Sequence, residues 1–304
     1  MRALTRRQFT RLAAGLGAAW WLPSLAAAQS AATPVITKLI PRSGERLPAV
    51  GLGTARVFDV GEDPDRRAAL ARVLHGLVAG GGTLIDTASS YGSAEAVVGD
   101  LVAQAGLRPR VFIATKVEAP DAEELRGSLE RLRTGNVDLL QLHNVRDPKQ
   151  TLGQFRDWKA EGRCRYIGIT STFHRDYGAV EAVLVREKPD FLEIDYSLDN
   201  REAEKRLLPL ASEMKTAVLT ALPFGRGRLF RAVRGKPLPE WARKFDVDSW
   251  AQFFLKFLLA DATVTAVIPG TADPAHMTDN LGAMHGRLPD AAQRKRMVEF
   301  VQTL

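Results

Sequence analysis

The most constraining feature of this 304-residue sequence is an eightfold alternation of short apolar runs with longer segments of helical periodicity. The apolar runs are rich in β-branched residues, whereas the intervening segments repeat apolar residues every three to four positions. Near-continuous apolar strands are typical of a parallel sheet that is covered by helices. The predicted strands occupy residues 49–55, 84–88, 111–116, 137–143, 166–171, 191–196, 217–221 and 264–270.

Eight strand–helix units in about 250 residues predict an α/β fold of the (β/α)8 TIM-barrel type. The alternative is a doubly wound open sheet, which normally carries G-x-G-x-x-G after its first strand when it binds a dinucleotide. The sequence GLGTAR at residues 51–56 lacks the third glycine, and no helix starts directly after it. Residues 35–50, VITKLIPRSGERLPAV, predict an N-terminal β-hairpin with its turn at Ser43-Gly44. We expect this hairpin to close the bottom of the barrel.

The N-terminus has the organisation of an export signal. Arg6-Arg7 precede an apolar run over residues 12–25, and small residues follow at Ala26 and Ala28. A charged region, a short apolar region and an A-x-A-like site predict a signal peptide over residues 1–28, followed by the barrel over 29–304. The adjacent arginines resemble the twin-arginine signal, so we expect periplasmic export in a folded state by the twin-arginine translocase. The apolar run is too short for a stable membrane anchor.

The charge and cysteine content bear on possible partners and on the source of stability. The four arginines of residues 1–28 account for four of the seven net positive charges, so the remainder carries +3 and gives no reason to expect nucleic acid as a partner. Cys164 is the single cysteine, which makes an intramolecular disulfide impossible. Stability must therefore come from the core.

Ionisable side chains end three consecutive predicted strands. Asp86 lies near the end of the second strand, Lys116 ends the third and His143 ends the fourth, while Tyr91 lies in the loop after the second. Alone, each has an ordinary explanation, such as a helix cap for the aspartate or a solvated position for the lysine. Because the active site of a TIM barrel lies at the carboxyl ends of its strands, the four together predict a catalytic site.

These four side chains suit general acid catalysis. A tyrosine hydroxyl ordinarily has a pKa of about 10, and a nearby ammonium group lowers the pKa by favouring the phenolate. We expect Lys116 to act on Tyr91 in this way, Asp86 to hold the lysine, and His143 to donate a hydrogen bond to a substrate oxygen. The sequence shows no nucleophile beside a base and no carboxylate cluster, so no metal is expected. The missing component is an electron donor.

Four motifs resemble those of the aldo-keto reductases. They are IDTASSYGSAE at residues 85–95, ATK at 114–116, LLQLHN at 139–144 and IPG…DNLGA at 268–283. The resemblance covers nearly the whole chain after the signal. It implies a (β/α)8 barrel that reduces a small aldehyde or ketone to an alcohol with a nicotinamide cofactor and without metal. Tyr91 would be the proton donor, Asp86 and Lys116 would tune it, and His143 would orient the carbonyl.

The resemblance also implies where the cofactor binds. Thr170 and Ser171 match positions that hold the nicotinamide carboxamide, Gly53 and Thr54 match the loop at the ribose and nicotinamide, and Asp279 and Asn280 match the pair at the adenine. The remaining implied cofactor residues are Glu193, Pro223, Gly225 and Gly270.

Several positions depart from the family pattern. Glu193 replaces a glutamine that commonly contacts the carboxamide, and Ala221 replaces an aromatic residue that stacks on the nicotinamide. Gly270 and His276, with Asp273 nearby, stand where a lysine and an arginine often bind the 2′-phosphate of NADP. The family favours NADPH over NADH, but NAD stays open. Arg226 or Arg228 could supply the charge instead.

These departures leave a second function open, a barrel that binds a cofactor or a sugar and has lost turnover. The four intact residues Asp86, Tyr91, Lys116 and His143 favour an enzyme. Aromatic residues of the long loops are candidates for the pocket wall or for ordinary packing: Phe58, Trp158, Phe224 and Trp241.

Overall fold

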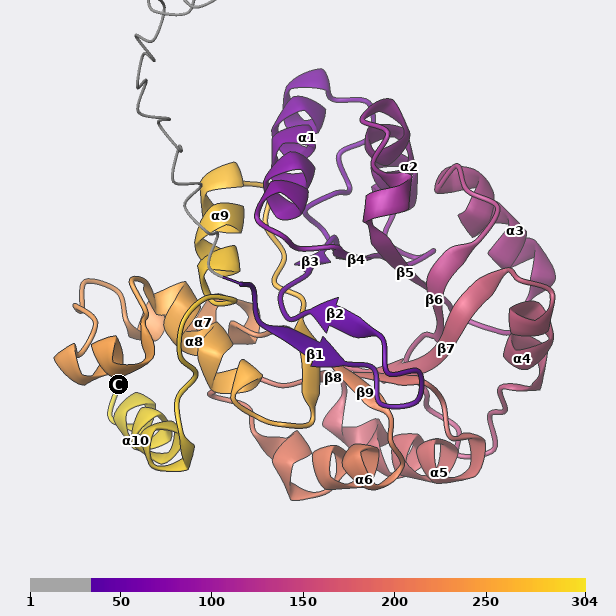
Figure 1. Cartoon of the computed structure of the whole chain (residues 1–304). Helices are drawn as coiled ribbons and strands as arrows, with labels where there is room; N and C mark the ends of the chain where they lie inside the picture. The colour runs from indigo at the N-terminus through magenta and orange to yellow at the C-terminus, as the bar shows by residue number, and fades with distance from the viewer. Residues whose placement is uncertain (1–33) are drawn as a thin grey trace, which may run out of the picture. The chain divides into compact units, whose positions relative to one another are not determined.

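Eight parallel strands form one continuous sheet in the computed structural model, which describes residues 34–304 (Figure 1). The predicted signal over residues 1–28 lies outside the described residues. Neighbouring strands follow the chain order without exception. The strands are β3 (Leu52–Gly53), β4 (Leu84–Asp86), β5 (Phe112–Val117), β6 (Val137–Leu142), β7 (Cys164–Ser171), β8 (Phe191–Asp195), β9 (Ala217–Ala221) and β10 (Val264–Val267).

The first and last strands close the sheet. Val50 and Gly53 form parallel bridges with Val267 and Gly270, and the Gly53 N–H donates a hydrogen bond of 3.1 Å to the Pro269 carbonyl. The predicted (β/α)8 barrel is therefore confirmed. The first predicted strand, 49–55, is regular only over Leu52–Gly53, because its remaining bonds are the irregular ones that close the barrel.

Helices follow the strands and pack around the sheet (Figure 1). Side-chain caps explain several of their starts: the carboxylate of Asp63 accepts from the Arg66 N–H, and the hydroxyl of Ser249 accepts from the Gln252 N–H. The α-helices are α1 (Pro64–Ala79), α2 (Ala94–Gln104), α3 (Ala122–Arg131), α4 (Gly153–Ala160), α5 (Tyr177–Glu187), α6 (Leu207–Glu213), α7 (Arg228–Ala232), α8 (Trp250–Leu259), α9 (Pro274–Gly282) and α10 (Ala291–Gln302). Short 3₁₀ segments are η2 (Arg108–Arg110), η3 (His174–Asp176), η4 (Glu202–Lys205), η5 (Gly225–Gly227) and η6 (Glu240–Phe245).

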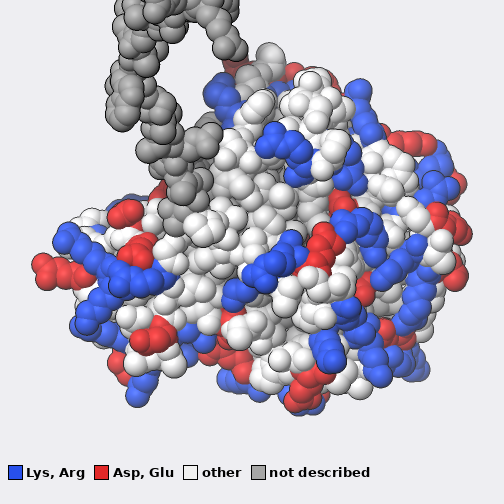
Figure 2. Space-filling model, viewed as in Figure 1, with Lys and Arg blue, Asp and Glu red and all other residues white. Residues whose placement is uncertain are grey.

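None of the helices between residues 34 and 304 is long and apolar enough to cross a membrane. On the face drawn in Figure 2, basic and acidic side chains are interspersed.

The predicted N-terminal hairpin is present and covers the amino ends of the barrel strands. Strands β1 (Thr37–Leu39) and β2 (Arg46–Pro48) pair antiparallel, and Gly44 in the turn has a φ of +74°, which glycine adopts readily. Ile40 and Leu47 are buried against side chains from the starts of the strands inside the barrel. These partners are Leu84, Phe112, Leu139, Tyr166, Phe191, Ala217 and Ala266.

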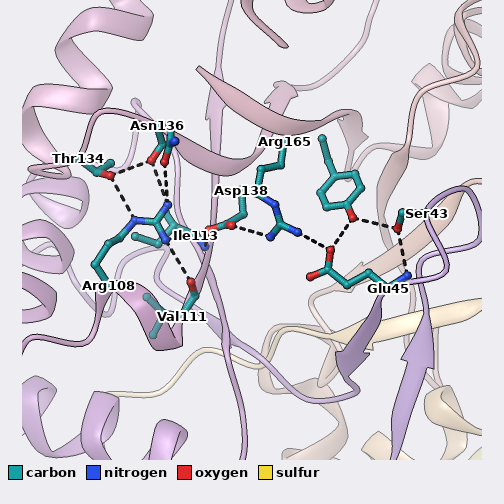
Figure 3. Close-up of polar contacts among 10 residues, drawn as sticks. Ser43, Glu45, Arg108, Val111, Ile113, Thr134, Asn136, Asp138 and Arg165 are labelled. Atoms are coloured by element: carbon teal, nitrogen blue, oxygen red, sulfur yellow. Dashed lines mark hydrogen bonds and ion pairs between the residues drawn. The ribbon is translucent and has the colours of Figure 1, made fainter. Parts of the chain in front are cut away.

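A polar network ties this hairpin to the strands (Figure 3). The Tyr166 hydroxyl donates a hydrogen bond of 2.6 Å to the Glu45 carboxylate, which also pairs with Arg165. Arg165 reaches Asp138 at 2.9 Å, and Asp138 in turn accepts from Arg108 at 3.1 Å. The chain of contacts fixes the hairpin at the end of the barrel opposite to the predicted site.

Lys256 cross-links three segments on the other side of the molecule. This α8 side chain is fully buried, and its amine lies 2.6–3.1 Å from the carbonyl oxygens of Phe245, Asp246, His285 and Arg287. Burial lowers the pKa of Lys256 to about 8, which still leaves it protonated at neutral pH. The ammonium therefore stabilises the loops that flank α8.

Candidate active site

A cavity of about 720 Å³ opens at the carboxyl ends of the barrel strands. Strand ends and loops from around the barrel contribute to its wall. Nine of the predicted catalytic and cofactor-binding residues line it: Gly53, Thr54, Asp86, Tyr91, His143, Thr170, Glu193, Pro223 and Gly270. The structure thus brings three of the four predicted catalytic side chains to one wall. The fourth, Lys116, lies directly behind that wall.

Lys116 is fully buried and lies between two carboxylates. Its Nζ is 2.5 Å from Asp86 Oδ2 and 3.2 Å from Glu193 Oε2, and it donates a hydrogen bond of 3.1 Å to the Thr87 carbonyl. The same atom lies 5.3 Å from the ring centroid of Tyr91. The lysine therefore connects both carboxylates to the tyrosine.

The sheet and one short loop position these groups. Asp86 ends β4 and pairs in register with Ala114 on β5, two residues before Lys116. The loop that carries Tyr91 is held against β5, because the Ser89 N–H donates a 3.0 Å hydrogen bond to the Lys116 carbonyl. The Tyr91 N–H then closes a turn onto the Ala88 carbonyl at 3.1 Å.

Burial and neighbouring charges shift the pKa values of Lys116 and Asp86. Burial alone would lower the pKa of Lys116, but the charges of Asp86 and Glu193 outweigh it and raise that pKa above its ordinary value. Burial and the charge of Glu193 raise the pKa of Asp86 well above its usual range. Lys116 is therefore the most firmly charged group of the site.

The pKa of Tyr91 corrects one expectation from the sequence. Burial raises this pKa to about 12, and the carboxylates of Asp86 and Glu193 add to the rise. Lys116 acts in the predicted direction and lowers the pKa, but it does not overcome burial. Tyr91 is therefore a protonated phenol at neutral pH, with a cation placed to stabilise its phenolate.

His143 lies beside Tyr91 with its ring nearly perpendicular, at 5.8 Å between centroids. Burial and the charge of Lys116 lower the pKa of His143, so the ring is neutral at pH 7. Its Nδ1 lies 2.5 Å from Glu118 Oε1 and 3.3 Å from Ser90 Oγ. When Nδ1 donates to Glu118, Nε2 is an acceptor. Donation from Nε2 to a substrate requires Nδ1 to accept from Ser90 instead, or the ring to be protonated.

Two predicted cofactor positions carry polar groups that face the cavity. Thr54 Oγ1 is buried and has no hydrogen-bond partner among residues 34–304, so a polar ligand group fits there. Thr170 Oγ1 accepts a 2.9 Å hydrogen bond from the Asn144 N–H. Gly53 is required by close packing, since a Cβ there would lie 2.8 Å from the Ile268 carbonyl oxygen.

Four predicted cofactor residues do not line the cavity. Ser171 Oγ accepts from the Phe173 N–H at 3.2 Å, and Asp279 accepts from Gln252 at 2.8 Å. Asn280 is buried on α9. Gly225 lies under Asp199, whose carboxylate would be 2.6 Å from a Cβ at that position.

The positions expected near a 2′-phosphate have other partners. Asp273 caps α9 by accepting from the Ala275 N–H at 2.8 Å, and exposed His276 lies 3.9 Å from it. Arg228 pairs with Asp199 at 2.8 Å. Arg226 lines the cavity and has no ion-pair partner in the part of the chain that the structure describes. Arg56 also lines the cavity and has no ion-pair partner among residues 34–304, so Arg226 and Arg56 are both available cations.

Among the predicted aromatic wall residues, only Phe224 lines the cavity. Phe58 is buried in the core, Trp158 packs on its α4 neighbour Phe155, and Trp241 packs against α8. The sequence interpretation missed other functional candidates: Phe230 and Arg56 on the cavity wall, Gln141 next to Glu193, and Glu118 on His143. Gln141 and Glu118 lie at strand ends, as the recognised residues do, which was the available signal.

No group of three or more His, Cys, Asp or Glu within residues 34–304 is arranged to hold a metal ion.

Comparison with known proteins identifies the family. Residues 49–299 match the Aldo/keto reductase family. The chain is 30% identical to the methylglyoxal reductase YeaE of Escherichia coli (strain K12), over 84% of this chain and 92% of that protein. It is 28% identical to the aldo-keto reductase str7 of Strobilurus tenacellus, over 80% of this chain and 84% of that protein. A crystal structure of an aldo-keto reductase from Klebsiella pneumoniae in complex with NADPH superposes with a TM-score of 0.74 at 25% identity, covering 88% of this chain and 95% of that one.

The barrel, the acid–base site and these relatives define an NAD(P)-dependent oxidoreductase. The chain belongs to the aldo/keto reductase family.

Proposed function

We propose that this protein reduces a small aldehyde or ketone to the alcohol in the periplasm, with Tyr91 as the general acid. NADPH supplies the hydride when it is bound. The observation that carries the proposal is the meeting of Tyr91, Asp86 and His143 at the cavity, with Lys116 buried directly behind them.

The chain's own residues account for the proton. Tyr91 is protonated at neutral pH, and its hydrogen can pass to the substrate oxygen as negative charge develops there. The ammonium of Lys116 stabilises the phenolate that this transfer leaves behind, and Asp86 holds the ammonium in place. His143 lies beside the tyrosine ring and orients the carbonyl.

We expect the protein to consume NADPH when it is given short aldehydes. The E. coli relative is named a methylglyoxal reductase, which supports a small 2-oxoaldehyde as the first substrate to test. Absorbance of the reduced nicotinamide with methylglyoxal and with simple aldehydes measures the reaction. If nucleotide binds tightly but no carbonyl is reduced, the protein is instead a cofactor- or sugar-binding barrel that has lost turnover.

Replacing Lys116 with Met should slow carbonyl reduction and move the pH dependence of alcohol oxidation. Oxidation needs the Tyr91 phenolate, and Lys116 is the group that lowers the pKa of Tyr91. Without the ammonium the rise in oxidation rate moves to higher pH, so both directions are slower at pH 7. A pH–rate profile of the variant measures this shift.

Lys295→Met is the matched control, since that side chain is 79% exposed on α10. An unshifted profile with a normal rate in Lys116→Met would assign the lysine a structural role only.

We propose NADPH as the preferred cofactor, with a modest preference. Gly53, Thr54, Thr170, Pro223 and Gly270 would hold the nicotinamide half, since they line the cavity beside Tyr91. Asp279 and Asn280 lie outside that cavity, and they would serve the adenine end.

The 2′-phosphate of NADPH should strengthen cofactor binding through a contact with Arg226. One charge-assisted contact contributes about 10- to 150-fold in affinity. Arg226→Gln should therefore reduce the ratio of NADPH to NADH affinity by about tenfold or more, whereas exposed Arg234→Gln should not. Fluorescence titration with both reduced cofactors measures the ratio. A wild-type preference beyond about a thousandfold would mean that further basic residues bind the phosphate.

Export is proposed from residues 1–28 alone. Nicotinamide cofactors are made in the cytosol, so an enzyme that leaves with its cofactor must leave folded. This requirement accounts for a twin-arginine signal.

A further inference from the structure

The site holds more negative charge than the reductase chemistry needs. Lys116 faces Glu193 as well as Asp86, and the three side chains are almost fully buried. Two carboxylates and one ammonium leave a net charge of −1 on side chains that are at most 4% exposed. An unbalanced buried charge is strongly destabilising, and such groups take up a proton instead.

Among residues 34–304, the strands beside the cluster supply no second buried cation, and the cavity-lining Arg56 and Arg226 are exposed. Gln141 on β6 and the register partner Thr170 on β7 are uncharged, as is Thr220 on β9. Tyr91 is protonated and His143 is neutral at pH 7. The other carboxylate nearby, Glu118, is 46% exposed behind His143, and it would only add to the negative charge.

The cluster also has more buried hydrogen-bond acceptors than donors. Gln141 Nε2 donates a 2.8 Å hydrogen bond to Glu193 Oε2. Asp86 Oδ1 and Gln141 Oε1, both buried acceptors, have no donor among residues 34–304. A proton on one of the two carboxylates would provide a donor inside the cluster and remove the net charge.

The contact between Gln141 and Glu193 depends on a glycine between them. Gly168 on β7 separates β6 from β8, and a Cβ there would lie 3.0 Å from the Gln141 side chain. Glycine at this position leaves the amide room to pass over β7 and reach Glu193. The second carboxylate is thus fixed by its own contacts from neighbouring strands.

We propose that Asp86 and Glu193 share one proton at neutral pH, which makes Glu193 a positioning residue for the acid–base site. The shared proton keeps the cluster of Asp86, Glu193 and Lys116 electrically neutral, so the lysine charge remains available to the Tyr91 phenolate. The raised pKa of Asp86 agrees with this arrangement. When the proton leaves at higher pH, the net charge of −1 opposes the ionisation of Tyr91 and weakens it as an acid.

Infrared spectroscopy of the purified protein tests the shared proton without any assay of turnover. We expect the C=O stretch of one protonated, buried carboxyl at pH 7 in the wild type. Glu193→Gln should abolish this band, because Asp86 then pairs with Lys116 alone and stays ionised. Asp86→Asn should abolish it as well. Loss of the band in both variants, although each removes only one carboxyl, is the signature of sharing.

Glu95→Gln is the matched control, since Glu95 is equally buried but bonds Thr115 and Arg131 outside the site. It should keep the band. A wild type without the band, or a Glu193→Gln variant that retains it, would overturn the proposal. A Glu193→Gln change that alters cofactor affinity and leaves the band in place would return Glu193 to the predicted role at the carboxamide.

The effect on rate rests on the proposed function, whereas the infrared band does not. The rate of carbonyl reduction by the wild type should fall through the same pH at which the band fades. Glu193→Gln should keep its rate through that pH, with its decline moved up by about one unit or more. An identical decline in both proteins would overturn the link to Tyr91, and no turnover in either would count against the reductase alone.

Discussion

Tyr91→Phe should abolish carbonyl reduction while leaving the fold and nucleotide binding nearly intact. The substitution removes only the hydroxyl, whereas the ring keeps its contacts with His143 and with the Lys116 amine. General acid catalysis contributes about 10²–10⁴-fold, so the rate should fall at least that far. Steady-state reduction of a short aldehyde measures the rate, and cofactor titration checks that binding is retained.

Tyr166→Phe, the same substitution at the opposite end of the barrel, is the control. The Tyr166 hydroxyl bonds Ser43 and Glu45 of the hairpin at the amino end of β7, whereas Thr170 near the other end of this strand lines the cavity. Tyr166→Phe should keep its activity. Tyr91→Phe activity within a few-fold of the wild type would rule out Tyr91 as the proton donor.

The fold could be predicted because its main signals are local. Apolar runs such as VDLLQL and FIATKV are buried on every residue in the structure, which is what a strand covered on both faces requires. The hairpin was readable for the same reason, since Ser43-Gly44 supplies a turn between two short extended runs. The first strand was predicted too long because barrel closure depends on bonds to residues 267–270, more than 200 positions away.

The positions of the catalytic side chains could be predicted because they lie at or after strand ends. The pKa values of these side chains could not. Neighbouring parallel strands place Asp86 and Lys116 side by side, so their pairing was expected. The predicted fall in the pKa of Tyr91 was wrong, because burial of the ring outweighs the effect of Lys116, which acts in the predicted direction. Sequence spacing carries no measure of that burial.

Contacts between strands that lie far apart in the sequence were the hardest to predict. Glu193 reaches Lys116 across the inside of the barrel, between β5 and β8. The sequence marked Glu193 only as a departure from the family's glutamine, and its partner became visible in three dimensions. The aromatic residues show the same limit, since Trp158 and Trp241 serve packing beneath helices whereas Phe230 faces the cavity.

Replacing both Arg6 and Arg7 with Lys should retain the protein in the cytosol as an uncleaved precursor. The change keeps the positive charge that an ordinary secretory signal needs, but it removes the planar guanidinium groups that a twin-arginine signal presents. Export should therefore fall from complete to undetectable, although residues 29–304 still fold and reduce aldehydes. Cell fractionation followed by detection of precursor and mature chain measures the outcome.

Lysine at Arg2 and Arg11 is the matched control, because it changes the same number of arginines within the same signal. That variant should be exported and cleaved normally. Mature protein in the periplasm from the Arg6→Lys, Arg7→Lys double variant would point to a general secretory signal, which carries unfolded chains. In that case the barrel would have to acquire its nucleotide outside the cytosol, and the argument for export with a bound cofactor would fail.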